Sequence, residues 1–549
     1  MFEPYIVAVA RASTGSAEEE EGETMSGTAS EAPTATGATL GKKNLTTIHA
    51  VAQALAIGPM FSAAIILGSI SRPDIGAGWN ATLAVLIAGL GVVAIAYTIS
   101  LYARRFAGAG AIYEYLTHGA HPWVGVFSAG FFFMGALFLG GGGIYLGLGI
   151  LTDGFWKAHV SHSGPAWWLW GVIALGLVLV LNYFGVRIAI RTMLTFAAIS
   201  FIPMLILAFV IIAKGGEGGN TLSVFNWHET SLFGITGGGV LGGVLLGILL
   251  FVGFEAAASI GEESEDPHRS IPRALIGTVA VAAVFFVFMA YAFSIGYGKE
   301  AVSKGAWAFS PSVMDDLGTK YINSTYAGLL DVIVILDATA LALAICVQVG
   351  RGFFALGRDG LLPSAFARTS RHGTPWVGNL MVAVGGIGLL LLVWSTDYLH
   401  RFLVPAGPGG SLVPAFPNNQ FAVFILSATI GSFAIELVYL ALAVFSFKLV
   451  RDGGNKPWQY VVVLVAVATP ILGFYGALSP QPHDRSNYNW EAAYWTIGLV
   501  VVAVVWFAIV ATMRRANVDN AAAHAAEHHG VAPLDETLDF QPAGDTTVP

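Results

Sequence analysis

The chain has 549 residues, of which 55% are hydrophobic and 11% are Asp, Glu, Lys or Arg, and its mean hydropathy is +0.70. A soluble globular body of this length needs more polar surface than this composition supplies, so the composition excludes one. The formal net charge of −8 does not indicate nucleic acid or another charged partner, because much of the acidic charge lies in the two terminal tails.

Both terminal tails are predicted to be disordered. Residues 1–44 are rich in Ser, Thr, Gly and Glu, and residues 516–549 are rich in Ala and acidic residues, so neither buries much apolar surface. The first ten residues contain Glu3 and are too short an apolar run for a signal peptide, and Met25 is a hypothetical alternative start. Three tail histidines could bind one metal ion if they lay on a helical turn, but an unstructured tail is the simpler interpretation. We predict no metal and no cofactor for this protein. The three histidines are His524, His528 and His529.

The rest of the chain contains twelve long apolar segments. A helix needs about 20 apolar residues to cross a bilayer, so the sequence predicts an all-α integral membrane protein with twelve transmembrane helices and a lipid bilayer as its surroundings. The segments are residues 49–70, 81–103, 124–151, 167–183, 190–213, 240–260, 274–296, 326–349, 376–394, 421–447, 461–478 and 492–512.

The distribution of basic residues predicts the orientation. If the N-terminus lies inside, 18 of the 26 Lys and Arg residues fall on the inner side. Cytoplasmic loops carry an excess of Lys and Arg. We therefore expect a multi-pass protein of the cell membrane with both termini in the cytoplasm.

Two of the twelve segments are interrupted near their middle. Gly58 and Pro59 break the first, because Pro lacks an N–H donor and Gly bends easily, and Gly253 and Glu255 interrupt the sixth. These segments lie five helices apart and run in opposite directions, which predicts two inverted halves of five helices with a substrate between unwound helices. The alternative is that Gly58 and Pro59 form an ordinary kink and that Glu255 only packs and hydrogen-bonds. A single break would favour this alternative, whereas the matched pair of breaks favours a transporter.

The stretch GFEAAASIGEESEDPHRSIPRA, residues 253–274, resembles the sixth-helix signature of the amino acid/polyamine/organocation (APC) superfamily, in its amino acid permease family. Residues 351–375 and 103–116 look like the loops that follow helices 8 and 2 in that superfamily. The resemblance implies a LeuT-like five-plus-five inverted-repeat core at residues 45–450, with discontinuous helices 1 and 6, followed by helices 11 and 12 at residues 451–515. It also implies a secondary transporter for an amino acid or related amine.

The two breaks define the expected substrate site. Free N–H groups at a half-helix start attract a carboxylate, and free carbonyls at a half-helix end attract an ammonium group. We therefore expect the N–H groups near Gly58 to bind the carboxylate of an amino acid and the carbonyls of residues 251–254 to bind its ammonium group. The predicted substrate-binding residues are Ile57, Gly58, Pro59, Met60, Phe61, Ser62, Phe251, Gly253, Phe254 and Glu255.

The coupling ion is left open between H⁺ and Na⁺, as is exchange without an ion. Some proton-coupled relatives place a Lys in helix 5 where this chain has Ser200, so that device is absent. Four acids lie at membrane depth, where charge is costly and usually functional: Glu255, Asp331, Asp337 and Glu436. Each could instead make an interhelical hydrogen bond, and for Glu255 a proton-carrying role and a hinge-holding role both remain open. The ion-coupling candidates are Glu255, Asp337, Thr339, Ser200 and Glu436.

The remaining motifs have simpler interpretations. The glycine runs at residues 140–149 and 237–247 predict close helix packing rather than nucleotide loops. Residues 404–417 are predicted to form an outer lid or linker, and Glu262 and Glu263 to meet water at the cytoplasmic exit. No H-E-x-x-H or G-x-S-x-G motif suggests an enzyme. Two alternatives remain for function: a transporter-fold sensor without net flux, and a carrier of polyamines or other organic cations. The oligomeric state is not predicted.

Overall fold

The computed structural model describes residue 40 and residues 43–233, 239–310, 312–405, 412–453, 456–479 and 487–521. The predictions for residues 1–39, for the start at Met25 and for the three tail histidines lie outside the described residues. Residues 515–521 are helical, although disorder was predicted from residue 516 onward. Asn517 Nδ2 donates to the carbonyl oxygen of Asp359 at 3.3 Å, and Trp123 Nε1 donates to Asp519 Oδ1 at 2.9 Å, which orders this segment.

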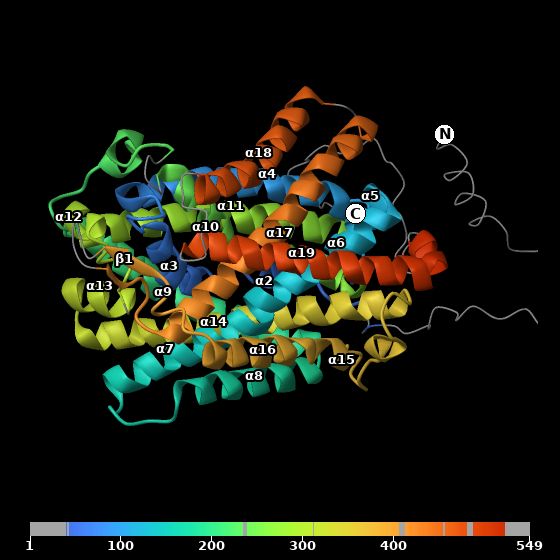
Figure 1. The fold of residues 1–549 in the computed structure, drawn as a ribbon, viewed down its shortest axis with the longest axis horizontal. Coiled ribbons are helices and arrows are strands. Elements are labelled where there is room, and N and C mark those ends of the chain that lie inside the picture. Colours follow the sequence, from blue (N-terminus) through green and yellow to red (C-terminus); the bar gives the residue numbers. More distant parts are fainter. Residues whose placement is uncertain are drawn as a thin grey trace, which may run out of the picture.

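The predicted membrane-spanning helices are present. In the described part of the chain, eleven helical spans are long and apolar enough to cross a membrane, and a shorter apolar helix of 17 residues supplies the twelfth predicted segment. They comprise α2 (Thr47–Ala54), α3 (Pro59–Ile70), α4 (Ala81–Ala103), α6 (Pro122–Ala136), α7 (Ile144–His159), α8 (Trp167–Tyr183), α9 (Val186–Ala213), α10 (Val244–Leu249), α11 (Pro267–Tyr297), α14 (Ser324–Arg358), α16 (Met381–Ser395), α17 (Asn419–Asp452), α18 (Pro457–Leu478) and α19 (Tyr488–Met513). Figure 1 shows most of them running along the long axis of the molecule, with α17 and α18 oblique to it.

The helices divide into a central group and a rim. Rim helices α8, α16, α18 and α19 expose large apolar side chains, among them Ile173, Val384, Leu464 and Val501. Such continuous apolar exposure suits contact with lipid. The segment Val240–Glu263, by contrast, is buried along its whole apolar stretch. The sixth segment therefore lies at the centre, where other helices shield it from lipid.

Short elements gather at the two ends of the bundle (Figure 1). One end, called here the α5 end, carries α5 (Ile112–Gly119), η7 (Ser364–Ala367) and α15 (Trp376–Asn379). The other, the β1 end, carries α12 (Lys299–Ser303), α13 (Val313–Tyr321) and an antiparallel hairpin of β1 (Leu403–Pro405) and β2 (Leu412–Pro414). This short hairpin is a local pairing within a fold that is helical, as expected.

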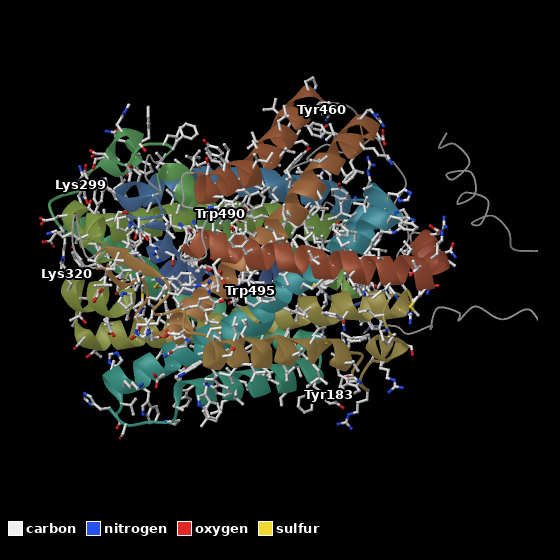
Figure 2. The ribbon with its side chains drawn as sticks, in the orientation of Figure 1. Tyr183, Lys299, Lys320, Tyr460, Trp490 and Trp495 are labelled. Carbon is white, nitrogen blue, oxygen red and sulfur yellow. The ribbon has the colours of Figure 1, made fainter. Side chains whose placement is uncertain are left out.

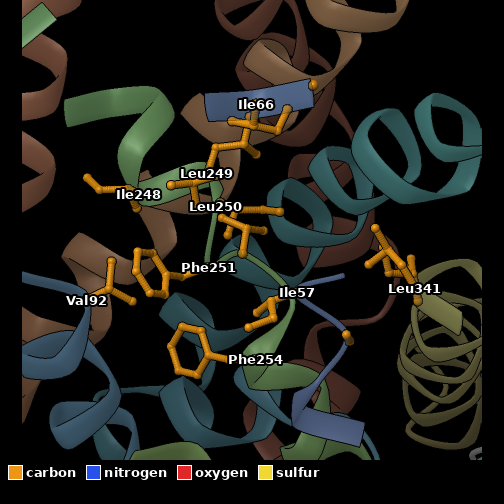
Figure 3. Packing of buried hydrophobic residues seen from close by; sticks show 14 of the residues in the cluster. Ile57, Ile66, Val92, Ile248, Leu249, Leu250, Phe251, Phe254 and Leu341 are labelled. Atoms are coloured by element: carbon orange, nitrogen blue, oxygen red, sulfur yellow. The ribbon is translucent and has the colours of Figure 1, made fainter. Parts of the chain in front are cut away.

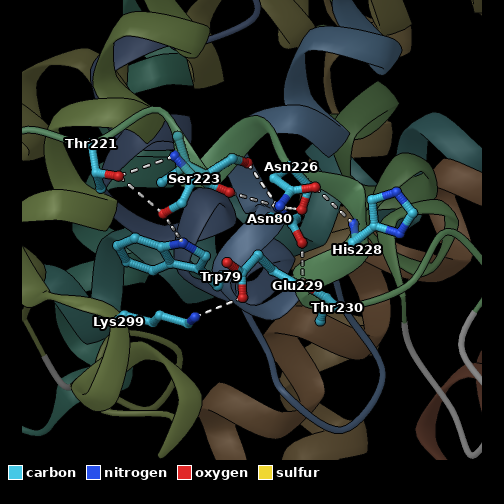
Figure 4. A network of polar contacts seen from close by, with 10 residues as sticks. Trp79, Asn80, Thr221, Ser223, Asn226, His228, Glu229, Thr230 and Lys299 are labelled. Carbon is cyan, nitrogen blue, oxygen red and sulfur yellow. Dashed lines mark hydrogen bonds and ion pairs between the residues drawn. The ribbon is translucent and has the colours of Figure 1, made fainter.

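A polar network fixes the loop that follows α9 at the β1 end (Figure 4). Asn80 Nδ2, at the end of η1 (Gly78–Asn80), donates to the carbonyl oxygens of Val224 at 2.9 Å and Asn226 at 3.0 Å. Lys299 Nζ pairs with Glu229 Oε2 at 2.6 Å. The loop is thereby tied to η1, which precedes α4, and to the start of α12.

The third predicted segment contains an irregular turn that the sequence did not predict. Between α6 and α7, η2 (Leu137–Gly143) is a π-helix with four glycines. A Cβ at Gly142 would lie 2.6 Å from Leu389 Cδ1 of α16, and one at Gly143 would lie 2.8 Å from Ser427 Oγ of α17. The close-packing interpretation of the glycine run is thus confirmed, and the wider π turn is typical of functional positions in helices.

Candidate functional site

The first segment is discontinuous, as predicted. Helix α2 ends at Ala54 and α3 begins at Pro59, with no regular helix between them. Pro59 stands at the first helical position, where a missing N–H costs nothing. Gly58 has a φ of 53°, in the left-handed region that glycine adopts readily. The local sequence therefore both ends one half-helix and starts the next.

The sixth segment is also discontinuous. It consists of η5 (Val240–Gly243), α10 and the 3₁₀ helix η6 (Phe254–Glu263), with a break at residues 250–253. Gly253 has a φ of 116°, a conformation that side chains disfavour. The break occurs at the predicted residues, although the second half is a 3₁₀ rather than an α-helix.

The two breaks touch each other. A Cβ at Gly253 would lie 2.8 Å from the carbonyl carbon of Ala56 and 3.4 Å from the backbone nitrogen of Ile57. Figure 3 shows Ile57 close to Leu250 and Phe254 of the sixth segment. Glycine is therefore required at position 253 both for its φ and for the direct approach of the two backbones.

A small, partly open cavity adjoins the two breaks. Side chains from the first, third, sixth, eighth and tenth predicted segments surround it, and among these described lining residues Ser62 alone has a polar side chain. The lining residues are Ile57, Phe61, Ser62, Ile66, Leu139, Ile144, Leu249, Val252, Leu341, Ile345, Phe424 and Ala428.

Three of the ten predicted substrate-binding residues line this cavity: Ile57, Phe61 and Ser62. The other seven lie behind it and shape the breaks. Phe251 packs edge-on against Phe286 of α11 with ring centroids 5.2 Å apart, and Phe254 packs against Tyr439 of α17 at 5.8 Å. The seven residues outside the lining are Gly58, Pro59, Met60, Phe251, Gly253, Phe254 and Glu255.

Sequence reasoning missed the lining contributed by the other three helices. The lining residues of these helices are apolar, as lipid-facing residues are. Hydropathy alone therefore does not show which apolar residues line the cavity and which contact lipid. One signal was available, because Leu139 and Ile144 flank the glycine run that widens into η2. Another was that Leu341 and Ile345 follow Asp337 at helical spacings of four residues.

Asp337 lies at the start of α3. Its Oδ2 accepts hydrogen bonds from the backbone nitrogens of Met60 at 2.9 Å and Phe61 at 3.0 Å, and the residue is 1% exposed. These are the N–H groups that the sequence assigned to a substrate carboxylate. In this structure these nitrogens donate to a carboxylate of the protein itself, which occupies the half-helix start.

Glu255 holds the second break. Its Oε2 accepts from the backbone nitrogen of Gly253 at 2.9 Å and from the Tyr439 hydroxyl at 2.6 Å, while its Oε1 accepts from Gln348 Nε2 at 3.2 Å. The predicted bond to neighbouring backbone is thus present. The carboxylate joins the unwound backbone to two separate helices.

The other coupling candidates make mostly local bonds. Thr339 Oγ1 donates to the Ile335 carbonyl of its own helix at 2.8 Å. Ser200 Oγ donates to the Phe196 carbonyl at 2.7 Å and reaches the Ile333 carbonyl of α14 at 3.4 Å. Glu436, fully buried in α17, accepts from Ser432 on the same helix at 2.6 Å. None of these bonds connects Thr339, Ser200 or Glu436 to the two breaks.

The far end of η6 joins a buried ionic cluster at the α5 end. Glu263, expected to meet water, is 2% exposed and pairs with Arg351, because α14 covers it. Glu262 pairs with Arg358 at 3.0 Å, and Arg358 also lies 3.7 Å from Glu114 of α5. Burial raises the pKa of Glu114 to about 7, and the negative charge of Glu262 contributes to the increase.

One group of described side chains could hold a metal ion. His159, Asp315 and Asp331 each offer a ligand atom, all within 4.8 Å of one another. His159 Nε2 lies 3.4 Å from both carboxylates, so a protonated histidine can pair with them directly. Asp331 thus lies towards the β1 end, beside α13 and away from the cavity.

Comparison with known proteins identifies the family. A family model described as amino acid permease matches residues 51–517. The branched-chain amino acid permease BcaP of Lactococcus lactis subsp. cremoris (strain MG1363) is 23% identical over 455 residues, 77% of this chain and 86% of that relative. The lysine-specific permease LysP of the same strain is 26% identical over 333 residues, 58% of this chain and 62% of that relative. The low-affinity putrescine importer PlaP of Escherichia coli (strain K12) is 24% identical over 438 residues, 75% of this chain and 84% of that relative.

These relatives are transporters of the APC superfamily and not enzymes, in agreement with the sixth-helix signature. The family model spans more than half of the chain and includes both breaks and every residue that lines the cavity. The protein therefore belongs to the amino acid permease family and is a multi-pass membrane transporter.

Proposed function

We propose that this permease carries an α-amino acid with an aliphatic side chain across the cell membrane by alternating access. The apolar lining of the cavity is the observation that carries the proposal, because eleven of its twelve residues are aliphatic or phenylalanine. Burying an aliphatic side chain there is favourable by about 1.5–3 kcal/mol. A second ammonium group in the same place would lose its hydration without gaining a partner.

The breaks supply groups for the amino acid's own charges. In the described part of the chain, the carbonyls of Ala56 and Val252 accept no backbone hydrogen bond, and both lie at the unwound segments. Unpaired carbonyls at a half-helix end favour an ammonium group. The start of α3 favours a carboxylate for the opposite reason. Rocking of the two broken helices would then open the cavity to each side in turn.

The organic-cation alternative finds less support. LysP and PlaP are named for lysine and putrescine, whereas BcaP is named for branched-chain amino acids. The carboxylates nearest the cavity are already engaged, Asp337 by two backbone donors and Glu255 by three donors. An apolar side chain fits the lining better than a cationic one.

We propose the orientation with the α5 end in the cytoplasm and both termini on that side. At the β1 end, where Figure 2 shows Lys299 and Lys320, basic groups are neutralised by acids: Lys299 pairs with Glu229 and Lys320 with Glu217. The positive-inside rule counts Lys and Arg rather than net charge, and the segments that meet at the α5 end carry Arg104, Arg105, Arg269 and Arg273 among others.

Uptake and exchange by the purified chain in proteoliposomes test this proposal, with labelled leucine, lysine and putrescine as probes. We expect leucine exchange and little movement of either cation. Leu at position 428 (Ala428→Leu) would fill the cavity beside Phe424, so leucine transport should fall 10- to 200-fold while alanine transport persists. Transport of putrescine or lysine in preference to leucine would overturn the substrate class, and leucine-induced thermal stabilisation without any exchange would indicate a sensor.

A further inference from the structure

The start of α3 has room for one carboxylate only. Pro59 has no N–H, the Ser62 nitrogen donates to the Gly58 carbonyl at 2.8 Å, and the nitrogens of Met60 and Phe61 both donate to Asp337 Oδ2. The four N–H groups of a helical start are normally what binds an anion. A substrate carboxylate that uses this helix start must therefore displace Asp337.

We infer that Asp337 is the coupling group of this transporter: its carboxylate occupies the place of the substrate's carboxylate on α3, and a proton that binds Asp337 releases this place to the substrate. The inference rests on the proposed transport of an α-amino acid and adds a coupling ion to it. Substrate and proton would then bind together, so each amino acid imported would carry one proton.

The position of Asp337 relative to the cavity supports the exchange. Phe61, whose nitrogen bonds Asp337, lines the cavity, and so does Leu341, one helical turn further along α14. A Cβ at Gly58 would lie 2.9 Å from Leu341 Cδ2, so α3 and α14 are in direct contact at this point. A short movement of the Asp337 side chain suffices to open the helix start to the cavity.

The surroundings of Asp337 make simultaneous binding of two carboxylates unfavourable. Its carboxylate accepts from the two backbone nitrogens, and in the described part of the chain no ion pair includes it. Two buried like charges that share one pair of donors repel strongly at low effective dielectric constant. Protonation removes one charge and turns Asp337 into a hydrogen-bond donor, which can face a substrate carboxylate.

The other titratable groups near this part of α14 are few. Helix α3 has no titratable side chain, and α9 carries Arg187 and Arg191 near its α5 end. Tyr145 of α7 and Cys346 of α14 are buried, and Glu255 of η6 faces α14 through Gln348, with three donors of its own. Glu262 and Glu263 lie at the far end of η6. Asp337 is thus the carboxylate whose bonds change when the substrate's carboxylate arrives.

The test compares wild-type chain with Asp337→Asn in proteoliposomes, with labelled leucine as the probe. In wild type we expect an inward proton gradient to drive accumulation and the leucine affinity to weaken by about tenfold per pH unit on the alkaline side. In Asp337→Asn we expect leucine exchange to persist, its affinity to be independent of pH and proton-driven accumulation to be lost. Asp331→Asn, six residues earlier on the same helix, is the matched control and should keep the wild-type pH dependence.

A second measurement needs no variant. Calorimetry of leucine binding to wild-type protein in two buffers of different ionisation enthalpy counts the protons taken up, and we expect about one per leucine. Accumulation that remains proton-driven in Asp337→Asn, or binding that takes up no proton, overturns the inference alone. Absence of leucine exchange and binding in wild type overturns the proposed function and the inference together.

Discussion

The two unwound segments differ in how a carboxylate holds them. At the sixth-segment break, Glu255 comes from the unwound segment itself and accepts from Gly253, Tyr439 and Gln348. At the first-segment break, Asp337 comes from another helix and accepts from two backbone nitrogens. A carboxylate held by three donors from three elements is expected to stabilise the break, here called a brace, whereas one that only covers a helix start can be exchanged for another anion. The roles that we infer for the two carboxylates therefore differ, although they lie at matched positions.

The largest effect should come from the glycine where the two breaks meet. Gly253→Ala places a Cβ against the Ala56 carbonyl at a φ of 116°, so we expect a loss of about 3 kcal/mol or more in the free energy of unfolding. Gly58→Ala should cost less, because its φ of 53° is tolerated and its new Cβ meets a flexible Leu341 side chain. Thermal unfolding of the purified Gly253→Ala and Gly58→Ala variants in detergent measures both losses of stability.

Gly277→Ala, in α11 with no atom within 4 Å of the new Cβ, is the matched control and should leave the unfolding temperature nearly unchanged. Equal losses for Gly253→Ala and Gly58→Ala would contradict the idea that the first break is the more adaptable one.

A pH-dependent effect is expected where η6 reaches the α5 end. Burial beside Glu262 raises the pKa of Glu114 from its ordinary value of 4.5 to about 7 in the folded protein. The protonated Glu114 carboxyl therefore contributes its full stabilisation below about pH 4.5, and this stabilisation is lost as the pH rises through about 7. The contribution to the free energy of unfolding is at most about 3 kcal/mol. Glu114→Gln lacks this titration, so its unfolding temperature relative to wild type should increase between pH 5 and pH 8.

Thermal scans across that pH range test the Glu114 effect, with Glu300→Gln as the control. Glu300 is exposed at the β1 end, and its replacement should not alter the pH dependence. A difference between Glu114→Gln and wild type that stays constant with pH would show that the carboxyl does not titrate in this window.

The sequence predicted both breaks because their causes are local. Pro59 disturbs a helix wherever it packs, and Gly58 and Gly253 adopt a positive φ that other residues disfavour. Hydropathy predicted the spans for the same reason. The bond between Asp337 and Met60 joins residues 277 positions apart, and no periodicity within either helix reports it. The sequence placed a substrate carboxylate on α3 and an acid on α14, but only packing shows that the two compete for one position.

The residues that line the cavity could not be predicted from the sequence, because their contacts also depend on packing between distant segments. Phe424 and Ala428 line the cavity and are apolar, as are the lipid-facing residues of the same helix. Hydropathy therefore does not separate cavity-lining positions from lipid-facing ones. Glu263 was assigned to water because it follows Glu262 near a charged loop, and burial by α14 reverses that assignment. Both errors arise where a third helix decides what a residue contacts.

The smallest effect tests the brace itself. Tyr439→Phe removes one of the three donors to Glu255, a hydrogen bond to a carboxylate of 2.6 Å, and should lower the free energy of unfolding by about 1.5 kcal/mol. Tyr115→Phe is the matched control, because the buried Tyr115 hydroxyl has no hydrogen-bond partner among the described residues and its removal should cost nothing. Denaturation of the two variants side by side gives the difference.

Transport by Tyr439→Phe distinguishes the role of Glu255 from that of Asp337. A brace that loses one of three donors still holds the break, so Tyr439→Phe should keep the wild-type pH dependence of leucine uptake while Asp337→Asn loses it. Loss of pH dependence in Tyr439→Phe would instead make Glu255 the proton carrier, because the Tyr439 hydroxyl bonds Glu255 and not Asp337. Unchanged stability in Tyr439→Phe relative to Tyr115→Phe would remove the evidence for a brace, since the bond would then contribute no more than an unpartnered hydroxyl does.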